Sequence, residues 1–257
     1  MKLYYQSNNG LLFNGDCLEV LKQIPDKSID AIITDLPYGT TACKWDNVIP
    51  FEPMWKQLKR IRKERTPIVL FGSEPFSSKL RMSNIKEYKY DWYWIKDKPS
   101  NFLMGKKQPL RYVEQIIIFY KKQPVYNPQM EKRDENNKRK NNMDKNLLKC
   151  EIIGITEKTD KYQKRLLSGI NDYIYPKNYQ KFNNRTKGYH PTQKPLALME
   201  YLIKTYTNEG DVILDFTAGS GTTLLAAEKL DRKWIGIELK PEYCEIVKKR
   251  LNKSPQK

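Results

Sequence analysis

Short apolar runs alternate with amphipathic stretches along most of the chain. Runs of about four to eight apolar residues that end in polar turns are typical of buried parallel strands. Such runs occur at residues 29–34, 67–71, 90–95, 114–120, 212–216 and 234–239. Helical periodicity lies between several of them, as in residues 51–63 and 222–230, and Pro195 is placed to begin a helix over residues 196–203. This alternation predicts a doubly wound α/β sheet.

A segment rich in Lys, Asn and Tyr, residues 121–188, interrupts this pattern. It holds 17 basic and 8 acidic residues, about half of the chain's excess positive charge. Within it, residues 131–146 are so polar that we expect a loop or a disordered segment in isolation, whereas residues 162–179 are compatible with a small folded piece. We interpret the segment as a module inserted between residues 1–120 and residues 189–257. The alternative is a solvated surface loop without a partner.

The charge of the whole chain indicates the kind of partner. The 257 residues include 47 lysine and arginine residues against 30 acidic ones, a formal net charge of +17. A positive excess of this size favours a polyanionic binding partner, and nucleic acid is the first such partner to consider. A basic compositional bias without a nucleic-acid partner is the alternative at this level. The charge does not identify the chemistry.

Cysteine and histidine usage excludes several kinds of site. The four cysteines, Cys17, Cys43, Cys150 and Cys244, form no C-x-x-C pair, so neither a disulfide framework nor a zinc ribbon is predicted. A single histidine, His190, excludes His-rich metal sites and mechanisms that need two histidines, and we expect no metal. Because no signal peptide and no membrane-spanning apolar run is found, we expect a soluble, cytoplasmic protein without a membrane partner.

A glycine-rich turn lies in the last quarter of the chain. Residues 211–223 read DVILDFTAGSGTT, and an Ala/Leu-rich helix and a strand ending in Glu238 follow. This order is typical of a nucleoside-binding βαβ unit. In such a unit Gly219 and Gly221 let the backbone approach the ligand, and Glu238 can accept hydrogen bonds from two ribose hydroxyls. Leu224 stands where a dinucleotide site has its third glycine, which disfavours a nicotinamide cofactor.

Three motifs together resemble a known family. The turn Asp35-Leu36-Pro37-Tyr38 resembles the Asp-Pro-Pro-Tyr motif of amino-group DNA methyltransferases, and residues 215–223 resemble their S-adenosylmethionine loop. Residues 190–195, HPTQKP, are similar to the segment that precedes the cofactor loop in the β class of that family. The order of turn, insert, HPTQKP segment and cofactor loop is also that of the β class. The resemblance covers residues 11–120 and 190–251.

The resemblance implies a Rossmann-like methyltransferase sheet in circularly permuted order, with residues 121–188 as the target-recognition region. Because the cofactor strands come last, another strand must lie beside them, and residues 11–17 suit this place. The resemblance puts Asp16 at the adenine part of the cofactor, although a role only as N-cap of a helix over residues 17–23 is equally compatible. The cofactor-binding residues that the resemblance implies are Asp16, Cys17, Asp35, Thr192, Gln193, Lys194, Asp215, Phe216, Ala218, Gly219, Ser220, Gly221, Thr222, Thr223 and Glu238.

The chemistry of the turn suits methylation of an amino group. The lone pair of adenine N6 is delocalised into the ring, so the nitrogen becomes nucleophilic only when acceptors bind its protons. We assign the Asp35 carboxylate and the Leu36 carbonyl as these acceptors, with Pro37 fixing the turn and Tyr38 stacking on the extruded base. Pro is usual at position 36, but the role falls on the backbone carbonyl. We predict site-specific methylation of flipped-out adenine in double-stranded DNA, because Asp heads the turn where cytosine enzymes more often have Ser.

Other functions remain as alternatives. Cytosine-N4 methylation keeps the same fold and mechanism, and a catalytically silent DNA-binding protein would keep the fold alone. Protein glutamine and RNA methyltransferases carry the cofactor loop before the turn, opposite to the order here, and the absence of a Pro-Cys dipeptide disfavours cytosine-C5 chemistry. Arg111 to Glu114 stand where many relatives have a His-Glu pair. We assign no catalytic role there, and Arg111 suits either a phosphate or an ion pair. A restriction endonuclease and a second copy of the chain are further partners that we consider.

Overall fold

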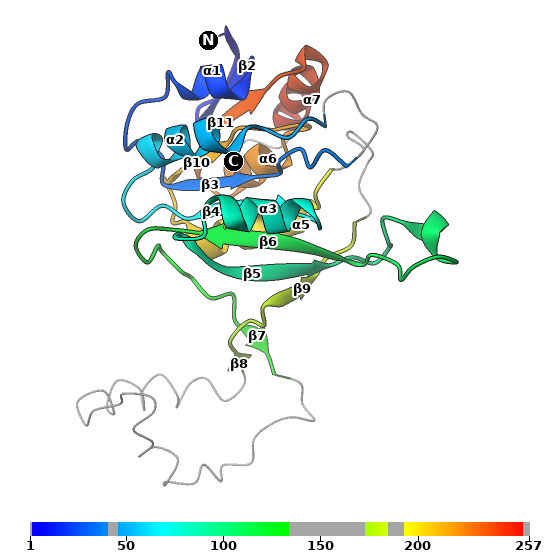
Figure 1. The fold of residues 1–257 in the computed structure, drawn as a ribbon. Coiled ribbons are helices and arrows are strands. Elements are labelled where there is room, and N and C mark those ends of the chain that lie inside the picture. The colour runs from blue at the N-terminus through cyan, green and yellow to red at the C-terminus, as the bar shows by residue number, and fades with distance from the viewer. Residues whose placement is uncertain (1, 41–45, 134–172, 185–192, 254–257) are drawn as a thin grey trace, which may run out of the picture. The chain divides into compact units, whose positions relative to one another are not determined.

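The computed structural model describes residues 2–40, 46–133, 173–184 and 193–253 (Figure 1). Within these ranges, nine strands form one sheet in the order β1-β2-β11-β10-β3-β4-β6-β5-β9. The strands of this sheet are β1 (Lys2–Gln6), β2 (Gly10–Asn14), β3 (Ala31–Thr34), β4 (Ile68–Gly72), β5 (Tyr88–Ile95), β6 (Val113–Phe119), β9 (Tyr179–Lys181), β10 (Val212–Asp215) and β11 (Lys233–Glu238). The helices are α1 (Cys17–Leu21), α2 (Phe51–Ile61), α3 (Phe76–Ser83), α5 (Leu196–Tyr206), α6 (Thr222–Lys229) and α7 (Pro241–Asn252), with a 3-10 helix η1 (Phe102–Met104).

Five adjacent strands of the sheet, β2, β11, β10, β3 and β4, are parallel. The two strands that come last in the sequence, β10 and β11, lie in the middle of the sheet between β2 and β3. β11 pairs with β2, so that Ile235 lies beside Leu11 and Glu238 beside Asn14. The strand predicted within residues 11–17 and the circularly permuted order are therefore confirmed.

The opposite end of the sheet is antiparallel. β6 pairs antiparallel with both β4 and β5, whereas β9 joins the outer edge of β5 in parallel. Antiparallel neighbours need only a loop between them, and the segment that joins β5 to β6 is such a loop. The sheet is therefore mixed, with a parallel centre that carries the motifs.

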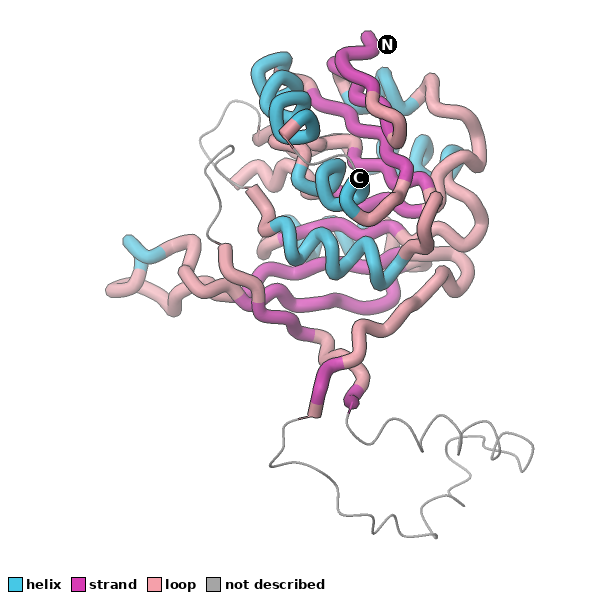
Figure 2. The backbone as a smooth tube through the Cα atoms, turned by 180° about the vertical axis from the view of Figure 1, so that it is seen from behind, coloured by secondary structure: helices cyan, strands magenta, loops and turns pink. Residues whose placement is uncertain are grey.

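Helices cover both faces of the sheet, which confirms the doubly wound α/β architecture (Figures 1 and 2). Successive strand residues point to opposite faces. In β3, Ile33 packs in the core under α5, α6 and α7, and its neighbour Ile32 packs in the core under α1, α2 and α3. In β4, Val69 and Leu70 divide between the two cores in the same way. The apolar runs at β3 and β4 therefore correspond to strands buried on both faces, whereas the run at β5 buries Trp92 and Trp94 and leaves Tyr93 exposed.

Three further elements, β1, α3 and α7, were not predicted from the sequence. β1 is mostly exposed and pairs only with β2. α3 is short and serine-rich, and it is held by burial of Phe76 and Leu80 rather than by helix propensity. α7 begins at Pro241, a residue suited to the first helical turn. No helix within the described ranges is long and apolar enough to cross a membrane.

A second compact unit spans Pro128–Lys177, and Met1–Asn127 with Asn178–Lys257 form the first. In the second unit the structure describes β7 (Glu131–Lys132) and β8 (Tyr173–Ile174), which pair antiparallel. β7 falls within residues 131–146, for which we predicted a loop or disorder in isolation; in the structure it pairs with the distant strand β8, and residues 134–146 lie outside the described residues. The unit is narrower than the predicted insert 121–188, since β9 belongs to the main sheet.

Candidate active site

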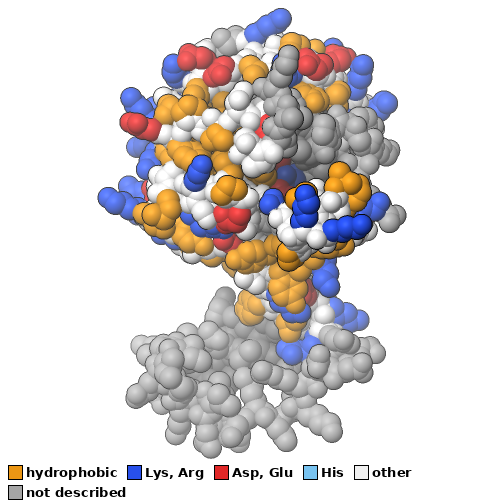
Figure 3. All heavy atoms as spheres, turned by 45° about the vertical axis from the view of Figure 1, so that its right-hand side comes forward, with side chains coloured by type: hydrophobic (Ala, Val, Ile, Leu, Met, Phe, Trp, Pro, Cys, Tyr) orange, Lys and Arg blue, Asp and Glu red, His pale blue; other side chains and the backbone are white. Residues whose placement is uncertain are grey.

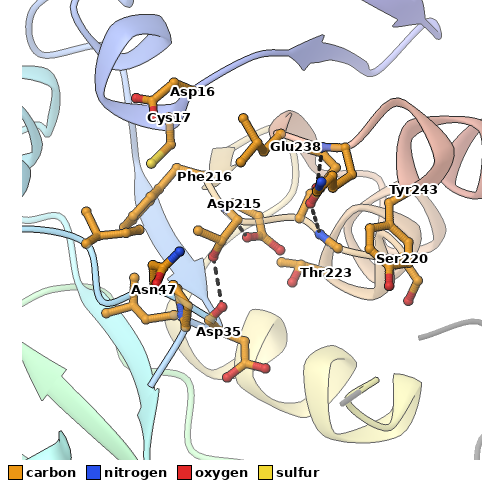
Figure 4. Close-up of a pocket in the computed structure, with 18 of the residues that line it drawn as sticks. Asp16, Cys17, Asp35, Asn47, Asp215, Phe216, Ser220, Thr223, Glu238 and Tyr243 are labelled. Carbon is orange, nitrogen blue, oxygen red and sulfur yellow. Dashed lines mark hydrogen bonds between the residues drawn. The ribbon is translucent and has the colours of Figure 1, made fainter. Parts of the chain in front are cut away.

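Acidic side chains follow four neighbouring parallel strands, at the edge of the sheet where these strands end. Asp16 comes after β2 and Asp35 after β3, and Asp215 and Glu238 are the last residues of β10 and β11. Because the carboxyl ends of parallel strands meet at one edge, all four line a single cavity of about 430 Å³. Figure 4 shows Asp16 and Asp35 at opposite sides of this cavity, with Asp215 between them.

The glycine-rich turn between β10 and α6 forms one wall of the cavity. Gly219 and Gly221 have φ angles of 53° and 76°, in the left-handed region that strains other residues. A Cβ at Gly221 would lie 2.8 Å from the Val247 side chain, so α7 packs directly behind the turn. Arg250 of α7 also donates to the main-chain oxygen of Ser220 at 2.5 Å. Backbone geometry and the contact with α7 thus fix the shape of the turn.

Glu238 lies at the end of β11 with both carboxylate oxygens turned to the backbone around the cavity. Oε2 accepts a hydrogen bond from the Gly219 amide and Oε1 from the Lys240 amide, both at 2.8 Å. Burial raises the pKa of Glu238 to about 7, although these backbone amides oppose the shift. A carboxylate has about four acceptor positions, so each oxygen can still accept from a bound molecule.

Asp215 connects the glycine-rich turn to the turn after β3. Its Oδ1 accepts from the Thr34 hydroxyl at 2.5 Å and from the Thr217 amide at 3.2 Å. Burial raises the pKa of Asp215 to about 6, against the hydrogen bonds that it accepts. The Thr217 hydroxyl in turn donates to the main-chain oxygen of Asp35 at 2.8 Å. The two motifs, far apart in the sequence, are therefore held together by hydrogen bonds.

The Asp35 side chain is fixed from two directions. Lys194 Nζ lies 2.7 Å from Oδ2, and the Tyr38 hydroxyl donates to Oδ1 at 2.8 Å. Burial raises the pKa of Asp35, and the Lys194 ammonium group opposes but does not cancel this shift. The Tyr38 ring stacks on Phe76, with 5.1 Å between the ring centroids and 27° between the planes. Phe76 thereby holds the ring that positions the Asp35 carboxylate.

Glu114 of β6 completes a buried cluster of charges. Its Oε1 lies 2.8 Å from Lys194 Nζ and 2.9 Å from the Tyr38 hydroxyl, and its Oε2 lies 2.7 Å from Lys96 Nζ. Burial raises the pKa of Glu114, but the two ammonium groups outweigh burial and lower it to about 2. We call Asp35, Lys194, Glu114 and Lys96 the charge cluster. Its two acids and two lysines balance, which lets the charges remain buried.

Lys194 holds the central place in the charge cluster. Burial lowers the pKa of Lys194, but the carboxylates of Asp35 and Glu114 outweigh burial and raise it, so the ammonium form persists. The ammonium group also lies 5.0 Å from the centroid of the Phe71 ring. Lys194 is therefore a bridge between the two acids as well as a residue of the cavity wall.

The structure places most of the site residues predicted from the sequence around the cavity. Those that line it are Asp16, Cys17, Asp35, Leu36, Pro37, Gln193, Lys194, Asp215, Phe216, Ala218, Gly219, Ser220, Thr222, Thr223 and Glu238. Asp16 also caps α1, accepting from the Leu18 amide at 2.8 Å. Tyr38 and Gly221 are not among the residues that line the cavity. Thr192 is outside the described residues.

Other residues of the site were not assigned from the sequence. The cavity is also lined by Gly15, Leu18, Asn47, Val48, Ile49, Pro50, Met199, Thr217, Leu239, Lys240 and Tyr243. The Asp46 carboxylate accepts from the amides of Gly39 and Thr40, at 2.8 and 2.9 Å, and so holds the backbone after the Asp35 turn. The sequence offered one signal for Glu114, which is that an acidic residue stands near the start of the apolar strand β6. A buried acid in such a strand requires a partner.

The cavity fits a nucleoside that carries a hydrogen-bond donor. Glu238 can accept from ribose hydroxyls, and Phe216 and Leu239 supply apolar surface. Gln193 Oε1 is buried beside the cavity without a hydrogen-bond partner among the described residues. A buried acceptor without a donor is unusual in a protein interior, so Gln193 Oε1 is available to a donor on a bound molecule.

Comparison with known proteins gives the family. A family model described as DNA methylase matches residues 29–249. The chain belongs to this DNA methylase family. The family covers methylation of adenine N6 and of cytosine N4, and the chain is an S-adenosylmethionine-dependent DNA methyltransferase. The resemblance found in the sequence motifs is thereby confirmed.

The sequence similarity to individual relatives of this DNA methylase extends over nearly the whole chain. The Type II methyltransferase M.BamHI of Bacillus amyloliquefaciens is 28% identical over 100% of this chain, which spans 60% of that relative's length. The Type II methyltransferase M2.LlaDCHI of Lactococcus lactis subsp. cremoris is 28% identical over 98% of this chain and 93% of its own length.

Solved structures agree with the fold of this DNA methylase. The complex of M1.HpyAVI with S-adenosylmethionine is 26% identical, with a TM-score of 0.62 over 94% of this chain and 100% of that chain. The cytosine-N4-specific PvuII DNA methyltransferase has a TM-score of 0.69 over 100% of this chain and 91% of that chain. At 20% identity the PvuII enzyme is similar in fold alone.

Proposed function

We propose that this DNA methyltransferase methylates N6 of a specific adenine that is flipped out of double-stranded DNA. The observation that carries the proposal is the Asp35 carboxylate, which lies at the cavity wall with both oxygens held by protein donors. A carboxylate at the head of this turn suits the amino group of adenine. A base must leave the duplex to reach a cavity of this kind.

The residues of the turn act on the amino group by accepting hydrogen bonds from its two N–H groups. S-adenosylmethionine supplies an electrophilic methyl group when it is bound. The Asp35 carboxylate and the Leu36 carbonyl accept hydrogen bonds from the two N6 protons. The nitrogen lone pair is then less delocalised into the ring and can attack the methyl group. Pro37 restricts the turn, and the Tyr38 ring, supported by Phe76, is available to stack on the base. Catalysis is by positioning and electrostatics, without a covalent enzyme intermediate.

The charge cluster keeps Asp35 in the form that this role requires. Asp35 can accept hydrogen bonds with both oxygens only as a carboxylate, yet its burial favours the neutral acid. Lys194 Nζ, 2.7 Å away, and the Tyr38 hydroxyl, 2.8 Å away, stabilise the charged form. We assign Lys194 and Glu114 as positioning residues, since they act on the base through Asp35 and Tyr38.

The cavity residues hold the cofactor in the proposal. Glu238 accepts from the ribose hydroxyls, Asp16 contacts the adenine end, and Gln193 accepts from the amino group of the methionine part. The glycine-rich turn gives close approach of the backbone. These roles match the available acceptors of Glu238 and the unpaired Oε1 of Gln193.

Cofactor binding should depend on the ionisation of Glu238. Because its pKa is about 7, the carboxylate becomes protonated as the pH falls and loses acceptor positions. We expect the affinity for S-adenosylmethionine to fall about tenfold between pH 8 and pH 6, as isothermal titration calorimetry can measure. Glu238→Gln should bind weakly at both pH values. Glu242→Gln, in the exposed first turn of α7, is the matched control, and an unchanged pH dependence in Glu238→Gln would contradict the role.

In this proposal, residues 121–188 recognise the DNA sequence. The segment carries 17 of the chain's 47 basic residues, and lysines and arginines that contact phosphates make binding salt dependent. The names of the Type II relatives suggest a restriction-modification context. A cognate endonuclease as partner and association of two copies of the chain are part of the same proposal.

The identity of the modified base tests the proposal directly. The chain is incubated with methyl-labelled S-adenosylmethionine and unmethylated duplex DNA, and the DNA is digested to nucleosides that are separated by chromatography and identified by mass. We expect the label in N6-methyladenine. Label in N4-methylcytosine would keep the mechanism and reverse the base, as in the PvuII enzyme. No label on several diverse DNAs would leave a silent DNA-binding protein as the better reading.

A further inference from the structure

The loop that joins β5 to β6 exposes apolar side chains. In residues 97–112 the Phe102 side chain is 70% and the Leu103 side chain 82% exposed, and Met104, Leu110 and Tyr112 are exposed as well. The loop extends from the sheet at the right of Figure 1. Several large apolar side chains that gather on one exposed loop mark a contact surface more often than single exposed residues do. We call residues 97–112 the β5–β6 loop.

Internal hydrogen bonds brace the β5–β6 loop. Asn101 Oδ1 accepts from the Arg111 amide at 2.6 Å, and Asn101 Nδ2 donates to the Pro109 carbonyl at 3.3 Å. The Gln108 amide donates to the Met104 carbonyl at 3.0 Å, which closes the turn after η1. The apolar tip is therefore presented on a defined scaffold, and little ordering is left for the moment of binding.

The charge of the β5–β6 loop selects the partner. The loop has four basic residues, Lys98, Lys106, Lys107 and Arg111, and one acid, Asp97. Asp97 accepts from the Asn184 amide at 2.6 Å, whereas the four basic side chains are exposed and have no ion-pair partner within the described part of the chain. Figure 3 shows basic and apolar side chains together on the side that bears the loop. Lysine and arginine around an apolar tip complement a phosphate backbone with stacked bases inside.

The base of the loop is part of the active site. Lys96, directly before the loop, contacts Glu114, the second residue after it, at 2.7 Å. The Lys96 amide also donates to the Tyr112 carbonyl at 2.8 Å. Because Glu114 contacts Lys194 and Tyr38, the loop leaves the protein body at the charge cluster. A DNA duplex whose target base lies at Asp35 would meet this loop.

We propose that the β5–β6 loop is a DNA wedge: its lysines bind phosphates, and Phe102 and Leu103 enter the duplex and occupy the space that the extruded base leaves. The inference rests on the proposed function, since it requires a duplex with a flipped base. Apolar side chains that enter between base steps replace the stacking contacts that are lost when a base is extruded. The wedge would therefore stabilise the flipped state and leave cofactor binding unchanged.

The wedge is tested with the full chain and the double variant Phe102→Ser/Leu103→Ser. The substrates are two duplexes built around the base that the labelling experiment identifies, one with the target paired and one with a mismatch opposite the target. We expect turnover on the paired duplex to fall at least tenfold and to recover to within about threefold of wild type on the mismatched duplex, because a mismatched base costs less to extrude. Met82→Ser/Ile85→Ser, with side chains 68% and 52% exposed, is the matched control.

Turnover like wild type on the paired duplex would overturn the wedge, and so would an equal loss on both duplexes. If the wild-type chain transfers no methyl group, the proposed function fails, and a second measurement still tests the loop. In that measurement, binding of a fluorescent mixed-sequence duplex is followed against salt. Lys106→Gln/Lys107→Gln should reduce the slope of log K against log salt by about 2, whereas Lys248→Gln/Lys249→Gln in α7 should not. An unchanged slope would refute DNA contact by the loop.

A second copy of the chain is the competing occupant of the apolar tip. Sedimentation of wild type and Phe102→Ser/Leu103→Ser decides between the two. The wedge requires the same oligomeric state in both. Dissociation of the variant into smaller species, together with unchanged DNA binding, would assign the tip to a protein interface and overturn the proposal.

Discussion

Replacing Asp35 by alanine should lower the rate of methyl transfer by about 100- to 1,000-fold, the range seen when one preorganised hydrogen-bond partner of a transition state is removed. The variant loses the acceptor for one amino proton. The main-chain oxygen that binds Thr217 remains, and so do Glu238 and Gln193. Affinity for S-adenosylmethionine should therefore stay within about threefold, since the removed group acts on the base. Single-turnover transfer and calorimetric cofactor binding measure the two effects separately.

Two further variants sharpen this test. Asp35→Asn keeps the shape of the side chain but replaces one acceptor by a donor, so it should be nearly as inactive as Asp35→Ala. Asp26→Ala removes an exposed aspartate that pairs with Arg60 and should be fully active. Transfer by Asp35→Ala at the rate of wild type would remove Asp35 from the mechanism. Loss of cofactor binding in parallel with transfer would make Asp35 a cofactor residue instead.

Replacing Lys194 by methionine should lower transfer at pH 7 by about 100-fold, the lower range for loss of a correctly protonated catalytic group. Lys194 holds the pKa of Asp35 down against burial. Without the ammonium group the pKa of Asp35 rises further, so its carboxylate forms only at higher pH. The acidic limb of the pH–rate profile should move to higher pH by at least about one unit, the smallest effect expected of a charge this close. Activity should return as the pH is raised.

The pH profile separates a positioning role from a merely structural one. Loss of a buried ion-pair partner also destabilises the fold, by about 3–5 kcal/mol, so circular dichroism must accompany the kinetics. Lys96→Met removes a lysine that contacts Glu114 but not Asp35, and it should move the acidic limb less. Lys229→Met, on the surface of α6, is the control. An acidic limb that stays in place in folded Lys194→Met would contradict the role.

The sequence carries much of the site because the motifs lie where parallel strands end. Residues 29–34 and 211–223 each read as an apolar run followed by a turn, and such turns meet at one edge of a doubly wound sheet. The order of the motifs also required a strand from the start of the chain beside β11, and β2 occupies that place. Residues as distant as Asp16 and Glu238 could therefore be assigned to one cavity without coordinates.

The charge cluster, in contrast, was decided by tertiary structure. Glu114 belongs to a strand whose antiparallel register with β4 sets Gln115 opposite Gly72 and so leaves Glu114 beside the Asp35 turn. Neither that register nor the pairing of Lys194 with two carboxylates follows from local periodicity. The same holds for β7 and β8, two short strands that form by pairing with each other.

What the sequence by itself determined is the family, the permuted order of the sheet and the acids at its carboxyl edge, since spacing and hydrophobic pattern are local properties. What only the tertiary structure decided is which side chains hold Asp35 and where the β5–β6 loop leaves the body. These depend on contacts between strands that are not neighbours in the chain. Such contacts are set by side-chain packing and by charge balance in a buried site. Neither can be inferred from the local pattern of the sequence.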